Sequence, residues 1–187
     1  MSSLLMNADD SCLVVVDVQE KLAPVMDDPR RVIEGSKRLL IAAQTLGIDL
    51  LITEQYPKGL GPTMIDLRQV VPPEEHPELY VEKTCFSCAF DDGFNAKFNA
   101  IGKSQAVVAG IESHVCVMQT CLGLKDAGKD VFVVQDCCSS RQAASVDAAM
   151  NRMRAAGIHV VTLEMVIFEW LKHSDRPEFK ELQGLIK

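Results

Sequence analysis

The apolar residues of this chain form short, nearly continuous runs that alternate with longer segments of helical periodicity. The clearest runs are rich in Val, Ile and Leu and cover residues 12–17, 49–53, 106–110, 131–136 and 158–162. A weaker run covers residues 79–83. Apolar runs with few polar interruptions are typical of strands that are covered on both faces, as in a parallel sheet.

The segments between these runs predict helices that end at glycine. The helical segments and their glycines are residues 30–46 before Gly47, residues 116–127 before Gly128, and residues 141–156 before Gly157. Glycine is common just after a last helical turn because it adopts the left-handed conformation without a steric penalty. The repeated order of helix, glycine and strand predicts parallel β-α units with right-handed crossovers, and therefore an α/β protein built as a three-layer α/β/α sandwich.

Two segments depart from this pattern. Residues 55–77 are interrupted by Pro and Gly, so we expect a loop-rich excursion near the carboxyl ends of the strands, where open sheets bind ligands. Residues 174–187 begin with helix-capping residues and continue as an amphipathic helix, whose expected role is packing or oligomerisation. Neither an internal repeat nor a second domain is visible, so the sequence predicts a single domain over residues 1–187.

Charge and composition narrow the classes of partner. The chain is 48% hydrophobic and 24% charged, and its net charge is -7. With no cluster of Lys and Arg, this acidic balance argues against a nucleic-acid partner. Residues 1–10 lack the features of a signal peptide, and no apolar run approaches the length of a membrane span. We therefore expect a cytoplasmic protein, a homo-oligomer that binds a small molecule and no membrane.

The cysteines do not form a disulfide framework. There are 7 of them, an odd number, so most are expected to be reduced thiols. Cys85 and Cys88 form a lone C-x-x-C motif, and the adjacent Cys137 and Cys138 are poorly placed to complete a tetrahedral zinc site. A redox role for Cys85 and Cys88 stays open as an alternative, and neither a metal nor another cofactor is expected.

Cys116 is the cysteine best placed to react. It follows the apolar run 106–110 across a polar turn and begins a predicted helix. Backbone N–H groups and the partial positive charge at a helix start stabilise a thiolate and can hold an oxyanion. A buried cysteine is also often just a small apolar side chain, so the case for chemistry depends on its partners.

Asp17 and Lys83 are the candidate partners of Cys116, because each closes an apolar run and parallel strands end at one edge of a sheet. Asp17 could take the proton of the thiol, Lys83 could orient the carboxylate, and the Cys116 sulfur could attack a carbonyl carbon. Asp17 could equally cap a turn and Lys83 could be solvated. Their spacing alone does not bring the three residues together.

Three segments resemble the signatures of the isochorismatase-like cysteine hydrolases, in order and at suitable separations. They are Val14-Val15-Val16-Asp17-Val18-Gln19, Glu82-Lys83-Thr84, and Ala109-Gly110-Ile111-Glu112-Ser113-His114-Val115-Cys116-Val117. Residues 53–63, residues 83–87 and the tail around residues 179–181 are most similar to the isochorismatase domain-containing subgroup. The similarity covers nearly the whole chain.

The resemblance implies a fold and a set of site residues. It implies a six-stranded parallel sheet, a catalytic triad of Asp17, Lys83 and Cys116, and an oxyanion site made by the backbone N–H groups of Glu112 and Cys116. It also implies a non-proline cis peptide near Ile111 and Glu112. Candidate residues for substrate binding are Gln19, Tyr56, Phe86 and His114, although an aromatic side chain can be core and His114 can be a capping residue.

Departures from other branches of that family narrow the expected chemistry. Nicotinamidases carry an Asp-x-His metal motif where this chain has Thr53-Glu54-Gln55-Tyr56, so metal-assisted hydrolysis is not expected. Isochorismatases, which cleave a vinyl ether, typically lack the nucleophilic cysteine. The expected function is therefore an amidase-type hydrolase that acts on a small amide or related acyl substrate through a Cys116 thioester. A catalytically weak binding or scaffold protein of the same fold is an alternative.

Overall fold

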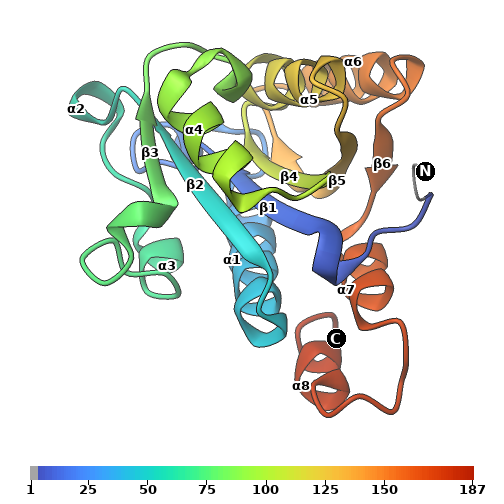
Figure 1. The fold of residues 1–187 in the computed structure, drawn as a ribbon. Helices are drawn as coiled ribbons and strands as arrows, with labels where there is room; N and C mark the ends of the chain where they lie inside the picture. The colour runs from blue at the N-terminus through green and yellow to red at the C-terminus, as the bar shows by residue number, and fades with distance from the viewer. Residues whose placement is uncertain (1–3) are drawn as a thin grey trace.

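The strands of the computed structural model form one six-stranded parallel sheet in the order β3-β2-β1-β4-β5-β6 (Figure 1). The strands are β1 (Ser11–Val16), β2 (Asp49–Gln55), β3 (Tyr80–Lys83), β4 (Gln105–Ile111), β5 (Asp130–Ser139) and β6 (His159–Val161). The structure describes residues 4–187, so the first three residues of the predicted domain lie outside the described part. The α/β fold class predicted from the apolar runs is confirmed, and the weakest run is the edge strand β3.

Helices cover both faces of the sheet and bury its central strands. Every residue of β1 and β4 is buried. Leu13 and Val15 point into a core shared with α1 (Pro29–Leu46) and α7 (Leu163–Leu171). Val14 and Val16 point into a second core shared with α4 (Asp92–Ile101), α5 (Met118–Asp126) and α6 (Ala143–Ala155). In Figure 1, α5 and α6 lie above the sheet and α1 lies below it.

The helix ends follow local rules of the sequence. The Asp28 side chain accepts a hydrogen bond from the backbone N–H of Arg31 and so caps α1, which ends at Gly47 with φ of 66°. Gly128 and Gly157 also have positive φ, of 82° and 74°. The predicted glycine stops therefore lie where the chain turns back toward the sheet.

Several predicted boundaries are wrong. The helix predicted from residue 116 begins at Met118, because Ser113–Val117 form a π-helical turn. The helix predicted from residue 174 is limited to α8 (Phe179–Gly184), which follows Pro177. The helices α4 and α7 were not predicted.

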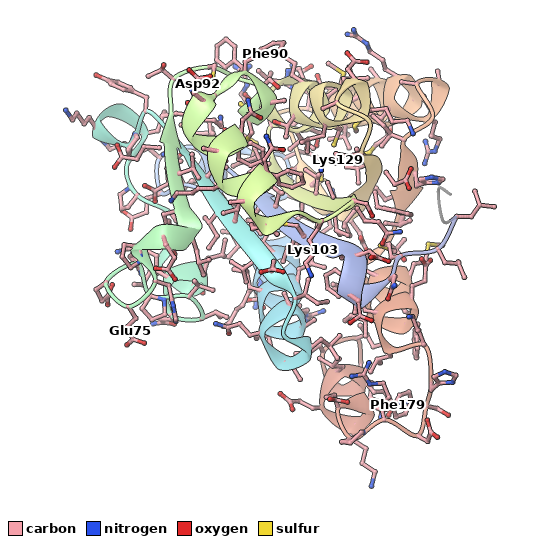
Figure 2. All side chains as sticks on the ribbon, in the orientation of Figure 1. Glu75, Phe90, Asp92, Lys103, Lys129 and Phe179 are labelled. Carbon is pink, nitrogen blue, oxygen red and sulfur yellow. The ribbon has the colours of Figure 1, made fainter. Side chains whose placement is uncertain are left out.

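The remaining short elements lie mostly in the connections. They are η1 (Ala8–Asp10), η2 (Ala23–Val25), α2 (Pro57–Leu60), α3 (Ile65–Arg68), η3 (Pro77–Leu79) and η4 (Cys88–Phe90). The helices α2 and α3 lie within the segment 55–77, which is otherwise irregular, as expected from its Pro and Gly content. Phe90, at the end of η4, is 75% exposed (Figure 2). Within residues 4–187, none of the helices is both long and apolar enough for a membrane span.

Gly110 allows the two central strands to approach each other, and its substitution gives a test of the packing. Its φ is 121°, and an added Cβ atom would collide with the Val16 backbone oxygen. We expect Gly110→Ala to lower the free energy of unfolding by about 3 kcal/mol or more, because neither backbone can move without disturbing the sheet. Urea unfolding measures this change.

Gly102→Ala is the matched control for that substitution. Gly102 also has positive φ, of 75°, but an added Cβ would meet nothing within 4 Å. This variant should lose only the left-handed backbone cost of about 1–2 kcal/mol. Equal losses for the two variants would contradict the close approach of β1 and β4.

Candidate active site

A buried ion pair between Asp17 and Lys83 lies at the carboxyl edge of the sheet. Asp17 directly follows β1 and has a positive φ of 52°, while Lys83 is the last residue of the edge strand β3. Lys83 Nζ lies 2.7 Å from Asp17 Oδ2, and both side chains are 0% exposed. Removing two charges from water is costly unless each finds further hydrogen bonds, so their other partners matter.

The Lys83 ammonium is surrounded by oxygen acceptors. It donates to Asp17 Oδ2, to Gln55 Oε1 at 2.7 Å, and to the carbonyl oxygens of Cys85 at 3.2 Å and Phe86 at 3.3 Å. Burial alone lowers the pKa of Lys83, but the negative charge of Asp17 outweighs it and raises the pKa above the ordinary lysine value. Lys83 is therefore a fixed cation that also holds the loop after β3.

Cys116 lies in the π-helical turn between β4 and α5 and is 5% exposed. The Asp17 carboxylate is close enough for its charge and its hydrogen-bonding capacity to act on the Cys116 thiol. Burial, followed by the charge of Asp17, raises the pKa of the thiol well above its ordinary value, and Lys83 offsets this only in part. This is the reverse of the thiolate stabilisation expected from the start of a helix, so Cys116 rests as a thiol beside a carboxylate.

The turn that carries Cys116 is tightly organised. The peptide bond between Ile111 and Glu112 is cis. The Glu112 carbonyl oxygen accepts hydrogen bonds from the backbone N–H groups of Val115 at 3.0 Å and Val117 at 3.2 Å. The Ser113 hydroxyl donates to the Ser139 carbonyl oxygen at 2.9 Å, which ties the turn to the end of β5. The backbone of Glu112 and Cys116, the two candidate oxyanion donors, is thus fixed to the sheet.

Gln19 is buried and has no donor left for a ligand. Its side-chain amide donates to the carbonyl oxygens of Gln55 at 3.0 Å and Gly61 at 2.7 Å, while its Oε1 accepts from the Gln55 backbone N–H. The Gln19 side chain therefore holds the loop after β2. Its amide N–H groups are not free for the direct substrate contact that the sequence predicted.

The other candidate substrate residues differ in exposure. Tyr56 and Phe86 are each 55% exposed, so neither belongs to the core. His114 is half-buried, and its Nδ1 lies 3.0 Å from Ser140 Oγ. A cavity of about 350 Å³ adjoins the ion pair, lined by Tyr56, Pro57, Lys58, Glu82, Lys83, Thr84 and Asp91. Tyr56 is therefore the candidate whose position beside a cavity is clearest.

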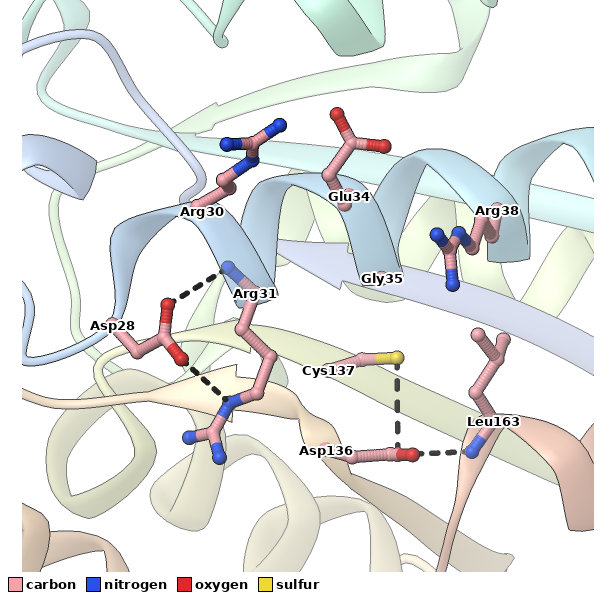
Figure 3. Close-up of a pocket in the computed structure, with 9 residues that line it drawn as sticks. All are labelled: Asp28, Arg30, Arg31, Glu34, Gly35, Arg38, Asp136, Cys137 and Leu163. Carbon is pink, nitrogen blue, oxygen red and sulfur yellow. Dashed lines mark hydrogen bonds and ion pairs between the residues drawn. The ribbon is translucent and has the colours of Figure 1, made fainter. Parts of the chain in front are cut away.

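A larger cavity, of about 460 Å³, lies away from these residues (Figure 3). It is bounded by α1, the end of β5 and the start of α7, and its lining includes Arg31, Arg38, Asp136 and Cys137 but no member of the candidate triad. Burial holds the pKa of Cys137 well above its ordinary value, so this thiol is not activated. Of these two cavities, only the smaller one is lined by a member of the candidate triad, Lys83.

The C-x-x-C motif does not have the properties of a redox pair. All 7 cysteines are free thiols. Cys88 is fully buried, and burial raises its pKa to about 12, while the pKa of the half-exposed Cys85 is also raised, chiefly by burial. Among residues 4–187, no group of three or more His, Cys, Asp and Glu side chains could hold a metal ion.

Two polar residues of the site, Thr53 and Gln55, were not predicted as site residues. Both belong to β2, which lies between the strands that carry Asp17 and Lys83. Thr53 Oγ1 donates to Asp17 Oδ1 at 2.7 Å, and Gln55 accepts from Lys83. The sequence does carry a signal for them: Thr53 and Gln55 are polar residues at alternate positions at the end of an apolar strand. Alternate residues of a strand lie on the same face, so their side chains are expected close together.

Comparisons with known proteins agree with this architecture. The isochorismatase domain matches residues 11–165. Isochorismatase domain-containing protein 2A of Mus musculus is 35% identical over 181 residues, which cover 96% of this chain and 84% of that protein.

Solved structures extend the comparison. A structure described as the MAR1 ribonuclease of Caenorhabditis elegans is 36% identical, with a TM-score of 0.88 over 97% of this chain and 92% of that one. An octameric hydrolase of unknown specificity from Escherichia coli is 24% identical, with a TM-score of 0.89 over 100% of this chain and 91% of that one, a likeness of fold alone. The family resemblance seen in the sequence is confirmed.

The buried ion pair makes a prediction about stability. Lys83→Met leaves the Asp17 carboxylate buried without its cation, so we expect the free energy of unfolding to fall by about 3–5 kcal/mol in urea unfolding. Adding Asp17→Asn removes the orphaned charge and should recover about 1–3 kcal/mol of that loss.

Lys103→Met is the matched control for the loss of a lysine. Lys103 pairs with Asp49 at 3.3 Å, with side chains that are 28% and 46% exposed, so this substitution should cost less than about 1 kcal/mol. If Lys83→Met costs no more than Lys103→Met, the buried pair does not hold the site together.

Proposed function

The chain belongs to the isochorismatase family, a family of hydrolases, and we propose that it hydrolyses small amides or related acyl compounds through a thioester on Cys116. The observation that carries this proposal is a buried carboxylate, paired with the Lys83 ammonium at 2.7 Å, whose charge acts on the Cys116 thiol. Such a set supplies a nucleophile, a base and a group that orients the base.

The first half of the reaction makes the thioester. Asp17 takes the proton of the Cys116 thiol as the sulfur attacks the carbonyl carbon. The negative charge that forms on the carbonyl oxygen is stabilised by the backbone N–H groups of Glu112 and Cys116. When the tetrahedral intermediate collapses, the proton held by Asp17 passes to the leaving amine, and the acyl group stays on sulfur.

The second half releases the acid. Asp17, again a carboxylate, takes a proton from water as the water oxygen attacks the thioester carbon. Collapse of this intermediate breaks the carbon–sulfur bond, and the proton on Asp17 returns to the Cys116 sulfur. Lys83 keeps its charge throughout, so it orients the carboxylate and limits the negative charge of the cluster.

The raised pKa of Cys116 fits a base-assisted attack better than a preformed thiolate. A thiol that rests protonated needs an acceptor at the moment of attack, and Asp17 is the carboxylate whose charge acts on it. We assign the walls of the substrate site to Tyr56 and Phe86, with Gln19 acting through the loop that carries Tyr56. His114, which is hydrogen-bonded to Ser140, lies in the same turn as the proposed nucleophile.

The alternatives have less support. A thiol redox reaction would need an accessible, acidic thiol, whereas Cys88 is buried and its pKa is about 12. A scaffold without turnover does not require a buried ion pair, because apolar side chains of similar volume are often at least as stabilising. Free cysteines fit a reducing compartment such as the cytoplasm.

The octameric relative, together with exposed Met165 and Phe168 on α7, supports a homo-oligomer.

Acylation by a simple activated ester tests the proposed nucleophile. With p-nitrophenyl acetate, peptide mass spectrometry should find the acetyl group on Cys116, because attack by the thiol precedes hydrolysis. Cys116→Ala should carry none, while Cys85→Ala, which removes the most exposed cysteine near the site, should be labelled at Cys116 like the parent. Asp17→Asn should slow acetylation by roughly 10²–10⁴. Acetylation of Cys85 in place of Cys116 would remove the thioester mechanism.

The relative described as a ribonuclease makes cleavage of RNA a second candidate reaction. A net charge of -7 disfavours the binding of a long polyanion. When single-stranded RNA is incubated with the parent protein and with Cys116→Ala, we expect no cleavage that depends on Cys116. The assay is done at low salt and in the presence of EDTA. Cleavage by the parent protein that is lost in Cys116→Ala would indicate that the substrate is a phosphodiester and not an acyl compound.

A further inference from the structure

The carboxylate of Asp17 has a fixed partner on each oxygen. Lys83 Nζ lies 2.7 Å from Oδ2, and Thr53 Oγ1 lies 2.7 Å from Oδ1. Thr53 is 0% exposed, and its strand β2 separates the strands that precede Asp17 and contain Lys83. With both oxygens held, the orientation of the carboxylate is fixed.

Cys88 lies on the other side of the Thr53 hydroxyl. Its Sγ is 3.8 Å from Thr53 Oγ1, and its backbone N–H donates to Thr120 Oγ1 at 2.9 Å. Thr53 has one hydroxyl proton and gives it to Asp17, so its oxygen is the acceptor for the Cys88 thiol. Because Cys88 is fully buried and stays protonated, it can serve as that donor. A chain of hydrogen bonds thus runs from Cys88 through Thr53 to Asp17.

We propose that Thr53 is a positioning residue that aims the Asp17 carboxylate at Cys116, and that the Cys88 thiol holds the Thr53 hydroxyl in this orientation. The inference rests on the proposed function, since it assigns Asp17 the part of the base. It also gives the C-x-x-C motif a role without redox chemistry: the carbonyl oxygen of Cys85 binds Lys83, and the thiol of Cys88 supports Asp17 through Thr53.

The physical reason is the sensitivity of proton transfer to geometry. A base that is displaced by about 1 Å can lose roughly 10²-fold in rate. Without the Thr53 hydroxyl, Asp17 Oδ1 loses its donor at 2.7 Å, and the carboxylate can rotate about its hydrogen bond to Lys83. The thiol proton then has no aligned acceptor, and ionisation of Cys116 by hydroxide becomes the main route to the nucleophile.

The test is the pH dependence of Cys116 acetylation by p-nitrophenyl acetate, followed by peptide mass spectrometry from about pH 6 to 9. In the parent protein the rate should change little over this range, because Asp17 takes the proton in place. In Thr53→Val the rate near neutral pH should fall by about 10- to 100-fold and should rise in proportion to hydroxide. Thr53→Ser keeps the hydroxyl and should restore both the rate and the flat profile.

Smaller changes are expected at Cys88. Cys88→Ala removes a weak donor and should slow acetylation by about 2- to 5-fold, while Cys88→Ser should stay close to the parent because its hydroxyl also donates. Thr63→Val is the matched control, since Thr63 is equally buried and its hydroxyl donates to Glu54, a carboxylate outside the triad. Its pH profile should remain flat.

The outcomes separate the two proposals. A parent protein without acetyl-Cys116 would contradict the proposed function itself. If the parent is acetylated and depends on Asp17, a flat profile at the parent's rate in Thr53→Val overturns the role of Thr53. A rate that is low but flat in both Thr53→Val and Thr53→Ser also overturns it, because packing alone would then explain the loss. If the valine side chain does not fit the buried site and Thr53→Val fails to fold, Thr53→Ala provides the same test, because alanine also lacks the hydroxyl and is smaller.

Discussion

The buried ion pair between Asp17 and Lys83 is the constraint on which the rest of the site depends. Two opposite charges that are 2.7 Å apart and 0% exposed persist only if other groups complete their hydrogen bonds. Thr53 does so for Asp17, while Gln55 and the carbonyl oxygens of Cys85 and Phe86 do so for Lys83. The end of β2 and the loop after β3 are therefore held in the positions that complete these hydrogen bonds.

The same ion pair also affects the protonation state of Cys116. Burial, followed by the charge of Asp17, raises the pKa of the Cys116 thiol, so in the proposed mechanism the sulfur keeps its proton until it attacks a substrate. A resting thiol is less open to oxidation than a thiolate. In the proposed mechanism, proton transfer depends on the direction in which the Asp17 carboxylate points. Residues that we propose fix this direction would then affect the rate without contacting the substrate.

The sequence predicted the sheet well because continuous apolar runs are specific for strands buried on both faces. Asp17, Lys83 and Cys116 became candidates because each follows or ends such a run, while the resemblance to the family implied that they act together. The raised pKa of Cys116 could not be predicted, because it depends on how deeply the turn is buried and on a carboxylate that is distant in sequence. Thr53 and Gln55 were missed since single polar residues at a strand end are common, and only the pairing of β2 with its neighbours brings them to the ion pair.

A crystal structure of the acyl-enzyme, trapped by freezing during turnover of a slow ester, tests the central claim most directly. We expect continuous density from Cys116 Sγ into the acyl group, with the carbonyl oxygen directed at the backbone N–H groups of Glu112 and Cys116. Asp17 should remain between Lys83 and Thr53, facing the thioester. An unmodified Cys116 with the acyl group on another residue, or an Asp17 carboxylate turned away from the sulfur, would contradict it.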